Sequence, residues 1–158
     1  MSFVALPEAK LHLRATEGTD EDALIGLYIN AAEQSAVSLL DRGVYADGTA
    51  LGVARAAALG ELVAATVTYT EAIAAAQALA DTTEQAAATQ AAEYAYLRAQ
   101  VAYRQTMDGM VVNDAIKSSV LLIVGHLYAH REDVVAGVSV AKLPNGAEWL
   151  LAPYRVYV

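Results

Sequence analysis

The sequence predicts an all-α protein: a small helical bundle core with a long alanine-rich antiparallel helical hairpin inserted in it, and an extended C-terminal tail. Two observations support this fold class. The chain has three prolines, all near its ends, so the 136 residues between Pro7 and Pro144 contain no obligatory helix breaker. Alanine, the strongest helix former, supplies 21 of the 56 residues from Ala50 to Gln105.

Two helices are expected in the first quarter of the chain. The first is short and has Pro7 in its opening turn, where a missing N–H does no harm. The second begins at a capping box formed by Thr19 and Asp22. It runs to about Arg42 and stops at Gly43, because glycine readily adopts the backbone conformation that ends a helix.

The second helix is apolar over most of its circumference, which is typical of a helix that packs on two sides. We expect one side to serve the core of the subunit and the other to contact a neighbouring subunit. The candidate residues for packing between subunits, on this helix and on a later helix near residue 120, are Leu24, Ile25, Tyr28, Ile29, Ala32, Ala36, Leu121, Leu122 and Tyr128.

Residues 44–112 are expected to form the inserted hairpin. One long helix starts at Ala50, and a second starts at a cap formed by Thr82 and runs to about Met107. The stretch 67–70, Val-Thr-Tyr-Thr, fits a helix least well because its residues favour strands. Alanine side chains let two helices approach closely, and thirty helical residues span roughly 45 Å. The sequence therefore predicts a slender hairpin that is longer than a small core needs.

The last third of the chain is expected to hold one long and one short helix. Asn113 or Asp114 caps a helix that runs to about Asp133, residues 138–143 form a loop or a short extended piece, and residues 147–151 form the short helix. The tail that follows is apolar and aromatic, and tryptophan, tyrosine and arginine are typical interface anchors. The candidate residues for docking a partner are Trp149, Leu150, Leu151, Pro153, Tyr154, Arg155, Val156, Tyr157 and Val158.

Composition argues against several classes of protein. The formal net charge is −8 and no basic stripe is visible, whereas proteins that grip DNA phosphates usually carry one. The chain has no cysteine, which excludes disulfides, cysteine nucleophiles and thiolate metal sites. No uninterrupted apolar run approaches the ~20 residues of a membrane helix, and the start lacks the pattern of a signal peptide. We therefore expect no membrane partner.

The sequence predicts no catalytic residue, metal site or cofactor, and we expect that the protein is not an enzyme. His126 and His130 are four residues apart, which places two imidazoles on one helix face, and Glu132 is nearby. A zinc-protease helix needs a glutamate directly after the first histidine, but Leu127 stands there. We interpret the pair as the polar edge of a buried helix. No glycine-rich loop that could hold phosphates appears either.

Three segments carry a family resemblance. Residues 19–32 read Thr-Asp-Glu-Asp-Ala-Leu-Ile-Gly-Leu-Tyr-Ile-Asn-Ala-Ala, an acidic start that runs into Ala-Ala. Residues 115–132 begin Ala-Ile-Lys-Ser-Ser and pass through an aliphatic run to Tyr-Ala-His-Arg-Glu. Residues 143–155 run from Leu-Pro-Asn-Gly to Leu-Leu-Ala-Pro-Tyr-Arg. Together they resemble the head–tail connector (adaptor) family of tailed bacteriophages.

The resemblance implies a connector domain with its core in residues 1–43 and 113–158, and an enlarged insertion at 44–112, where typical members have a short segment. It implies that copies of the chain form a ring under the phage portal protein and provide a platform for the next neck or tail protein. Double-stranded DNA would pass through the ring without sequence-specific binding, and an acidic lumen would repel its phosphates. The protein would belong to the neck of the virion, after synthesis in the cytoplasm of the host bacterium.

Three other interpretations stay open on the sequence. The chain could be a different neck or tail-completion protein, such as a stopper or a tail terminator. It could be a helical ligand-binding bundle that uses His126, His130 and the tyrosines. It could coat a membrane surface or a granule, although the basic amphipathic face typical of such helices is missing.

Overall fold

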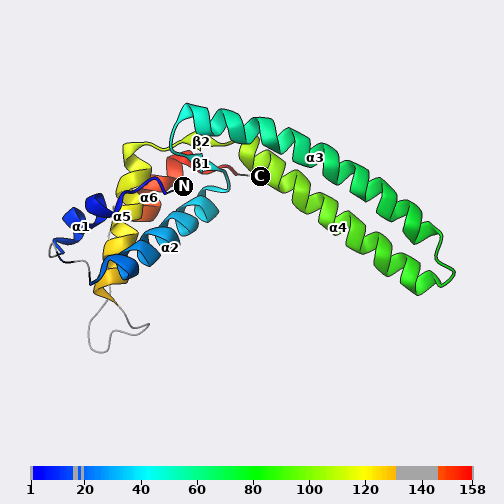
Figure 1. Ribbon diagram of the computed structural model, residues 1–158, viewed down its shortest axis with the longest axis horizontal. Coiled ribbons are helices and arrows are strands. Elements are labelled where there is room, and N and C mark those ends of the chain that lie inside the picture. Colours follow the sequence, from blue (N-terminus) through cyan, green and yellow to red (C-terminus); the bar gives the residue numbers. More distant parts are fainter. Residues whose placement is uncertain (1, 16–17, 19, 131–145, 158) are drawn as a thin grey trace. The chain divides into compact units, whose positions relative to one another are not determined.

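The computed structural model describes residues 2–15, 18, 20–130 and 146–157 (Figure 1). The chain divides into two compact units. The core unit consists of residues 1–47 and 110–158, and the hairpin unit of residues 48–109. Apart from two strands of two residues each, all regular elements among the described residues are helices, which confirms the all-α prediction and the inserted hairpin.

The core unit is built around two helices, α2 (Asp22–Leu40) and α5 (Asp114–Ala129), which pack along each other. The short helices α1 (Leu6–Leu13) and α6 (Ala147–Leu151) lie against them, and α6 continues into a 3₁₀ turn, Ala152–Tyr154. Fully buried aliphatic side chains hold these elements together. The largest buried side chains of this core are Val4, Ile25, Leu40, Ile116, Val120, Val124 and Leu151.

Helix α2 begins and ends slightly inside the predicted bounds. It starts at Asp22 after Glu21, whose side chain makes no capping bond, and Thr19 lies outside the described residues. It ends at Leu40 because Asp41 takes the left-handed conformation at φ 52°, which aspartate tolerates better than most residues. Gly43 has a separate role, since a Cβ there would lie 2.7 Å from the ring of Tyr45.

A small parallel sheet, which the sequence did not reveal, lies where the chain leaves and re-enters the core unit. Strands β1 (Val44–Tyr45) and β2 (Met110–Val111) pair in parallel, with Met110 N–H donating to the Gly43 carbonyl at 2.9 Å. Both strands belong to the core unit, so the insertion begins at Gly48 and ends at Gly109. The predicted boundaries, 44 and 112, are each a few residues outside the compact hairpin.

The hairpin unit consists of α3 (Gly48–Gln77) and α4 (Thr82–Met107), which run antiparallel side by side (Figure 1). The cap of α4 is Asp81 rather than Thr82, because the Asp81 carboxylate accepts the N–H groups of Thr83 and Glu84. Between the helices lie small side chains, and the rings of Tyr69 and Tyr96 stack with centroids 4.8 Å apart.

The β-branched stretch 67–70 is helical in spite of its composition. Hydroxyl groups of this region turn back onto the helix: Thr66 Oγ1 donates to the Leu62 carbonyl and Thr68 Oγ1 to the Ala64 carbonyl. Such bonds let threonine satisfy its hydroxyl inside a helix. Packing of α3 against α4 thus overrides the local preference for strand.

Helix α5 begins as predicted, with Asn113 as its cap: the side-chain oxygen accepts the Ile116 N–H at 3.0 Å. It ends at Ala129, four residues before the predicted end at Asp133. The loop predicted at 138–143 lies outside the described residues. The short helix predicted at 147–151 is confirmed as α6.

Among the residues that the structure describes, two helices, α2 and α3, are long and apolar enough to cross a membrane by length and composition. Helix α2 supplies much of the core described above. In α3, only 6% of the most apolar 18-residue window is buried inside the chain. Helix α3 therefore exposes an unusual amount of apolar surface, which the prediction from uninterrupted apolar runs had missed.

Candidate interaction surfaces

The C-terminal segment 146–157 is fixed to the core by its own side chains and backbone. Leu151 is 1% exposed and belongs to the core cluster. Tyr154 packs against the same cluster, and its carbonyl accepts a hydrogen bond from the Arg42 guanidinium at 3.3 Å. Val156 N–H donates to the Leu40 carbonyl, at the end of α2, at 3.0 Å. These contacts hold the segment in one position.

The anchored segment presents two large aromatic side chains to solvent. Trp149 is 60% exposed and Tyr157 is 74% exposed. The Arg155 guanidinium lies 5.2 Å from the centre of the Tyr157 ring, within the range of a cation–π contact. We call Trp149, Pro153, Arg155 and Tyr157 the C-terminal surface, since all four are exposed.

This geometry corrects part of the predicted docking set. Leu151 cannot contact a partner because it is buried, and Tyr154 and Val156 serve to attach the segment to the core. Leu150 is half-buried. The predicted residue Val158 lies outside the described residues. Sequence composition could not separate the residues that anchor this segment to the core from those that it exposes to solvent.

The predicted subunit-packing residues of α2 also divide into two groups. Ile25, Ile29, Ala32 and Ala36 are buried in the core of their own chain, so the prediction that they pack between subunits is wrong. They face α5 and α1, which fill the space that a neighbour would need. Leu24 and Tyr28 are only partly buried.

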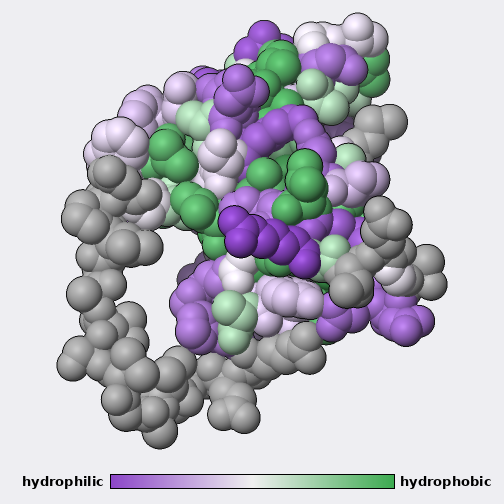
Figure 2. All heavy atoms as spheres, turned by 90° about the vertical axis from the view of Figure 1, so that its left-hand side faces the viewer, coloured by the Kyte–Doolittle hydropathy of each residue, from purple (hydrophilic) through white to green (hydrophobic). Residues whose placement is uncertain are grey.

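Three further leucines of the core unit are exposed: Leu11 on α1, Leu27 on α2 and Leu122 on α5. Of the other predicted packing residues, Leu121 packs partly against the core, and Tyr128 donates its hydroxyl proton to the Glu21 carboxylate. Figure 2 shows the end of the core unit that carries α1 and α5, where hydrophobic patches (green) lie open among hydrophilic ones.

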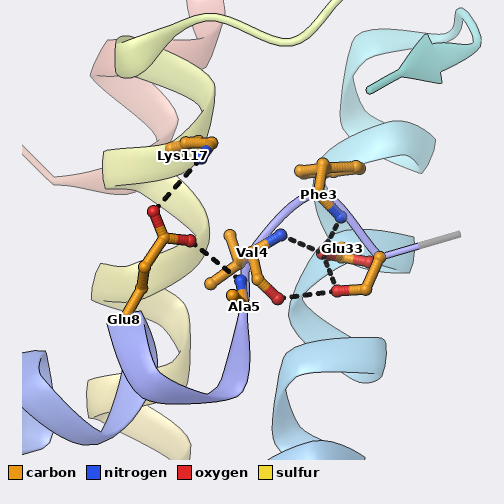
Figure 3. Close-up of polar contacts among 7 residues, drawn as sticks. Phe3, Val4, Ala5, Glu8, Glu33 and Lys117 are labelled. Atoms are coloured by element: carbon orange, nitrogen blue, oxygen red, sulfur yellow. Dashed lines mark hydrogen bonds and ion pairs between the residues drawn. The ribbon is translucent and has the colours of Figure 1, made fainter. Parts of the chain in front are cut away.

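The N-terminal segment 2–5 is fastened to α2 by Glu33, a residue that sequence reasoning did not single out (Figure 3). The carboxyl oxygen Oε1 of Glu33 accepts three hydrogen bonds, from Ser2 Oγ at 2.7 Å and from the Phe3 and Val4 N–H groups at 2.9 Å. Phe3 and Val4 are buried against the core. Glu33 therefore satisfies backbone groups that no helix or sheet could serve.

Glu8 links three elements of the core unit (Figure 3). Its Oε2 accepts the Ala5 N–H at 2.8 Å, which caps α1, and its Oε1 lies 3.2 Å from the Lys117 ammonium on α5. The backbone bond, and then the hydrogen bond from Lys117, hold the pKa of Glu8 below its ordinary value. An open groove of about 600 Å³ lies beside these contacts, between segment 2–6 and α2.

The Glu8 contacts predict a pH dependence. A carboxyl group with a lowered pKa adds stability that is present above its ordinary pKa of 4.5 and is lost as the pH falls through the lowered value. We expect the urea midpoint of the native chain to exceed that of Glu8→Gln at neutral pH. The two midpoints should converge as the solution is acidified below 4.5. A constant difference at every pH would contradict this explanation.

The two histidines do not form a metal site with the residues that the structure describes. Their rings are 4.8 Å apart and inclined by 52°. Within the described ranges, no group of three or more histidine, aspartate or glutamate side chains could hold a metal ion, and Glu132 lies outside them.

Comparison with protein-family models, with curated proteins and with solved structures found no match to this chain.

Proposed function

We propose that the protein is a structural subunit of a bacteriophage neck: copies form a ring, bind beneath the portal, continue the DNA channel and carry the next neck or tail protein. The observation that supports this most directly is the C-terminal surface. Exposed Trp149 and Tyr157 stand on a segment that Leu151 and the Val156–Leu40 bond hold in place. A rigid aromatic anchor of this kind is suited to docking into a partner, because little side-chain or backbone freedom is lost on binding.

The position of the three connector-like segments in the fold also supports the proposal. The described parts of residues 19–32, 115–132 and 143–155 form most of α2, most of α5, and α6 with the turn after it. These elements pack on one another in the core unit. Three stretches that are far apart in the sequence thus belong to one packed domain, as a shared family core requires.

The charge and the exposed leucines fit a ring through which DNA passes. Leu11, Leu27 and Leu122 provide apolar contacts for identical neighbours in a closed cyclic assembly. The net charge of −8 disfavours attachment to DNA phosphates, so the inner wall would let DNA slide.

Imaging and mass measurement of the assembled protein test the proposal. The purified full chain, alone and mixed with the portal protein encoded by the same phage, is examined by native mass spectrometry and negative-stain electron microscopy. We expect closed rings with a central hole, alone or seated on the portal. Failure to form rings under both conditions, or binding only to a tail protein, would overturn the portal-binding role.

Replacement of the two exposed aromatics tests the docking surface. Trp149→Ala combined with Tyr157→Ala should weaken portal binding by at least about 30-fold, because even one interface hot spot typically contributes about 2 kcal/mol or more. The free energy of unfolding should change little, since both side chains are exposed. Deletion of residues 154–158 is a poorer test, because it removes the Tyr154 and Val156 contacts with the core. Undiminished binding of the double variant would exclude this surface.

A further inference from the structure

Each helix of the hairpin unit carries two seams of mostly small or apolar residues. The inner seams face each other and include the buried residues Ala58, Ala76 and Ala92. The outer seam of α3 is exposed, follows three- and four-residue steps, and includes Val53, Gly60, Val63, Val67, Thr70 and Ala74. The outer seam of α4 is exposed in the same way and consists of Ala87, Gln90, Tyr94, Leu97 and Val101. This spacing is that of a coiled-coil heptad.

The outer seams lie on the far sides of their helices. With 3.6 residues per turn, the centre of each outer seam is roughly 160–170° around the helix from the centre of the inner seam. A helix with two opposed apolar seams is suited to packing between two other helices. Within the hairpin each helix has one helical neighbour, so the outer seams are open within their own unit, with Tyr94 65% and Val63 58% exposed.

The two outer seams match each other in register. The stacked pair Tyr69–Tyr96 fixes which residues of α3 and α4 are level along the hairpin. At that register Val63 is level with Val101 and Val67 with Leu97. If two hairpins stand side by side at the same height, Val63 and Val67 of one therefore meet Val101 and Leu97 of the next, with Thr70 opposite Tyr94 and Ala74 opposite Gln90 at the two ends of this apolar patch. The same antiparallel geometry that forms the hairpin would thus be repeated.

Charge also matches across this contact. Glu71 lies directly beside the outer seam of α3, one residue after Thr70. Arg98 lies in the same way beside the outer seam of α4, one residue after Leu97. When these two helices face each other antiparallel, both residues occupy heptad position e and lie on the same side of the contact. They are offset along the axis by roughly 7 Å, a distance that a glutamate and an arginine side chain can span. The opposite flank brings no two like charges together.

We propose that the outer seam of α3 binds the outer seam of α4 in a second copy of this chain. The contact is heterologous, because α3 of one hairpin meets α4 of the next, and each added copy presents the same free seams. We take the partner to be a second copy of this chain for two reasons. The apolar residues of the two outer seams lie at matching heights, and Glu71 and Arg98 carry opposite charges beside them. The inference stands on the hairpin alone and adds to the proposed function an assembly contact outside the core unit.

Disulfide trapping tests this contact on the full chain, which contains no cysteine of its own. In Val63→Cys combined with Val101→Cys, the two thiols lie on opposite sides of one hairpin and can join only between copies. Mild oxidation should give a ladder of linked dimers, trimers and larger species on a non-reducing gel. The matched control, Thr68→Cys with Ala95→Cys, places two exposed thiols at the same level off the seams and should give no ladder.

A charge exchange in the same cysteine background tests the specificity of the contact. Glu71→Arg should reduce cross-linking by about fivefold, and adding Arg98→Glu should restore it, because the pair is then reversed but complementary. Glu61→Arg makes the same charge change on an exposed position off the seam and should have no effect.

Several outcomes would overturn the proposal. These are no ladder, a ladder equal to that of the control pair, or cross-linking that ignores the charge exchange. Sedimentation of the uncross-linked protein with phosphatidylcholine–phosphatidylglycerol vesicles would instead assign α3 to lipid. Closed rings that form without cross-links would contradict the hairpin contact and leave the proposed function intact. Cross-linked open filaments that do not bind the portal would support the hairpin contact and contradict the proposed function.

Discussion

Replacing Leu151 with alanine is expected to lower the free energy of unfolding of the core unit by about 3 kcal/mol, as is typical when a leucine is truncated in a packed core. The side chain is 1% exposed and lies in the same cluster as Ile116, Val120 and Val124 of α5. Its loss would leave a cavity under α6 and loosen the segment that carries Trp149 and Tyr157. Urea unfolding followed by circular dichroism measures the change, and binding to the portal protein proposed as its partner should weaken with it.

The matched control is Leu11→Ala, the same chemical change at a leucine that is 82% exposed. It should alter the free energy of unfolding by less than about 0.5 kcal/mol. Comparable losses for the two variants would show that Leu151 is not part of a close-packed core. A stable Leu151→Ala variant that still docks normally would remove the link between core packing and the C-terminal surface.

The hairpin was predictable because two simple properties agree over sixty residues. No proline interrupts 48–107, and alanine favours a helix at almost every turn, so local preference and packing give the same answer. The stretch 67–70 fitted the helix prediction least well. It is helical nonetheless, and the Thr68 hydroxyl donates a hydrogen bond to the Ala64 carbonyl one turn earlier. The strands β1 and β2 could not be predicted, since two residues each carry no periodic pattern and depend on distant chain ends meeting.

The division of α2 into a core face and an outer face was not predictable for a different reason. Two apolar stripes on one helix show that it packs on two sides, but not which stripe meets its own chain. The arrangement of α5 decides this, by burying Ile25 and Ile29 and leaving Leu27 open. The same ambiguity applied to the C-terminal segment, where neighbouring Trp149 and Leu151 have opposite roles. Side chains of one helical turn can face in different directions, which composition does not record.

Glu33 was not predictable as a structural residue, because nothing in the sequence links it to a segment thirty positions earlier. A glutamate on α2 is typically solvated, and this one is 8% exposed. Its partners are mostly backbone N–H groups, which have no sequence signature. The residue is needed because segment 2–5 belongs to no helix or strand, so its buried N–H groups have no backbone partner in a regular element.

Replacing Glu33 with alanine should therefore lower the free energy of unfolding by about 3 kcal/mol, since hydrogen bonds to a charged group contribute about 1.5–3 kcal/mol each and are only partly replaced by water. The variant leaves the buried Phe3 and Val4 N–H groups without their acceptor. The segment is expected to detach, because water reaches these groups only if it lifts from the core. Urea unfolding gives the magnitude, and hydrogen exchange at the Phe3 and Val4 amides should become fast.

Two further variants separate the hydrogen bonds from the general effect of removing a negative charge. Glu33→Gln keeps a side-chain oxygen at the same place and should retain much of the stability. Glu61→Ala removes a carboxylate from an exposed position of α3 and should change the free energy of unfolding by less than about 0.5 kcal/mol. If Glu33→Ala were as stable as Glu61→Ala, with the two amides still protected, the N-terminal segment would be held by the burial of Phe3 and Val4 alone. Slow hydrogen exchange at the Phe3 and Val4 amides in Glu33→Gln, with fast exchange in Glu33→Ala, would show that the side-chain oxygen at position 33 holds the segment in place.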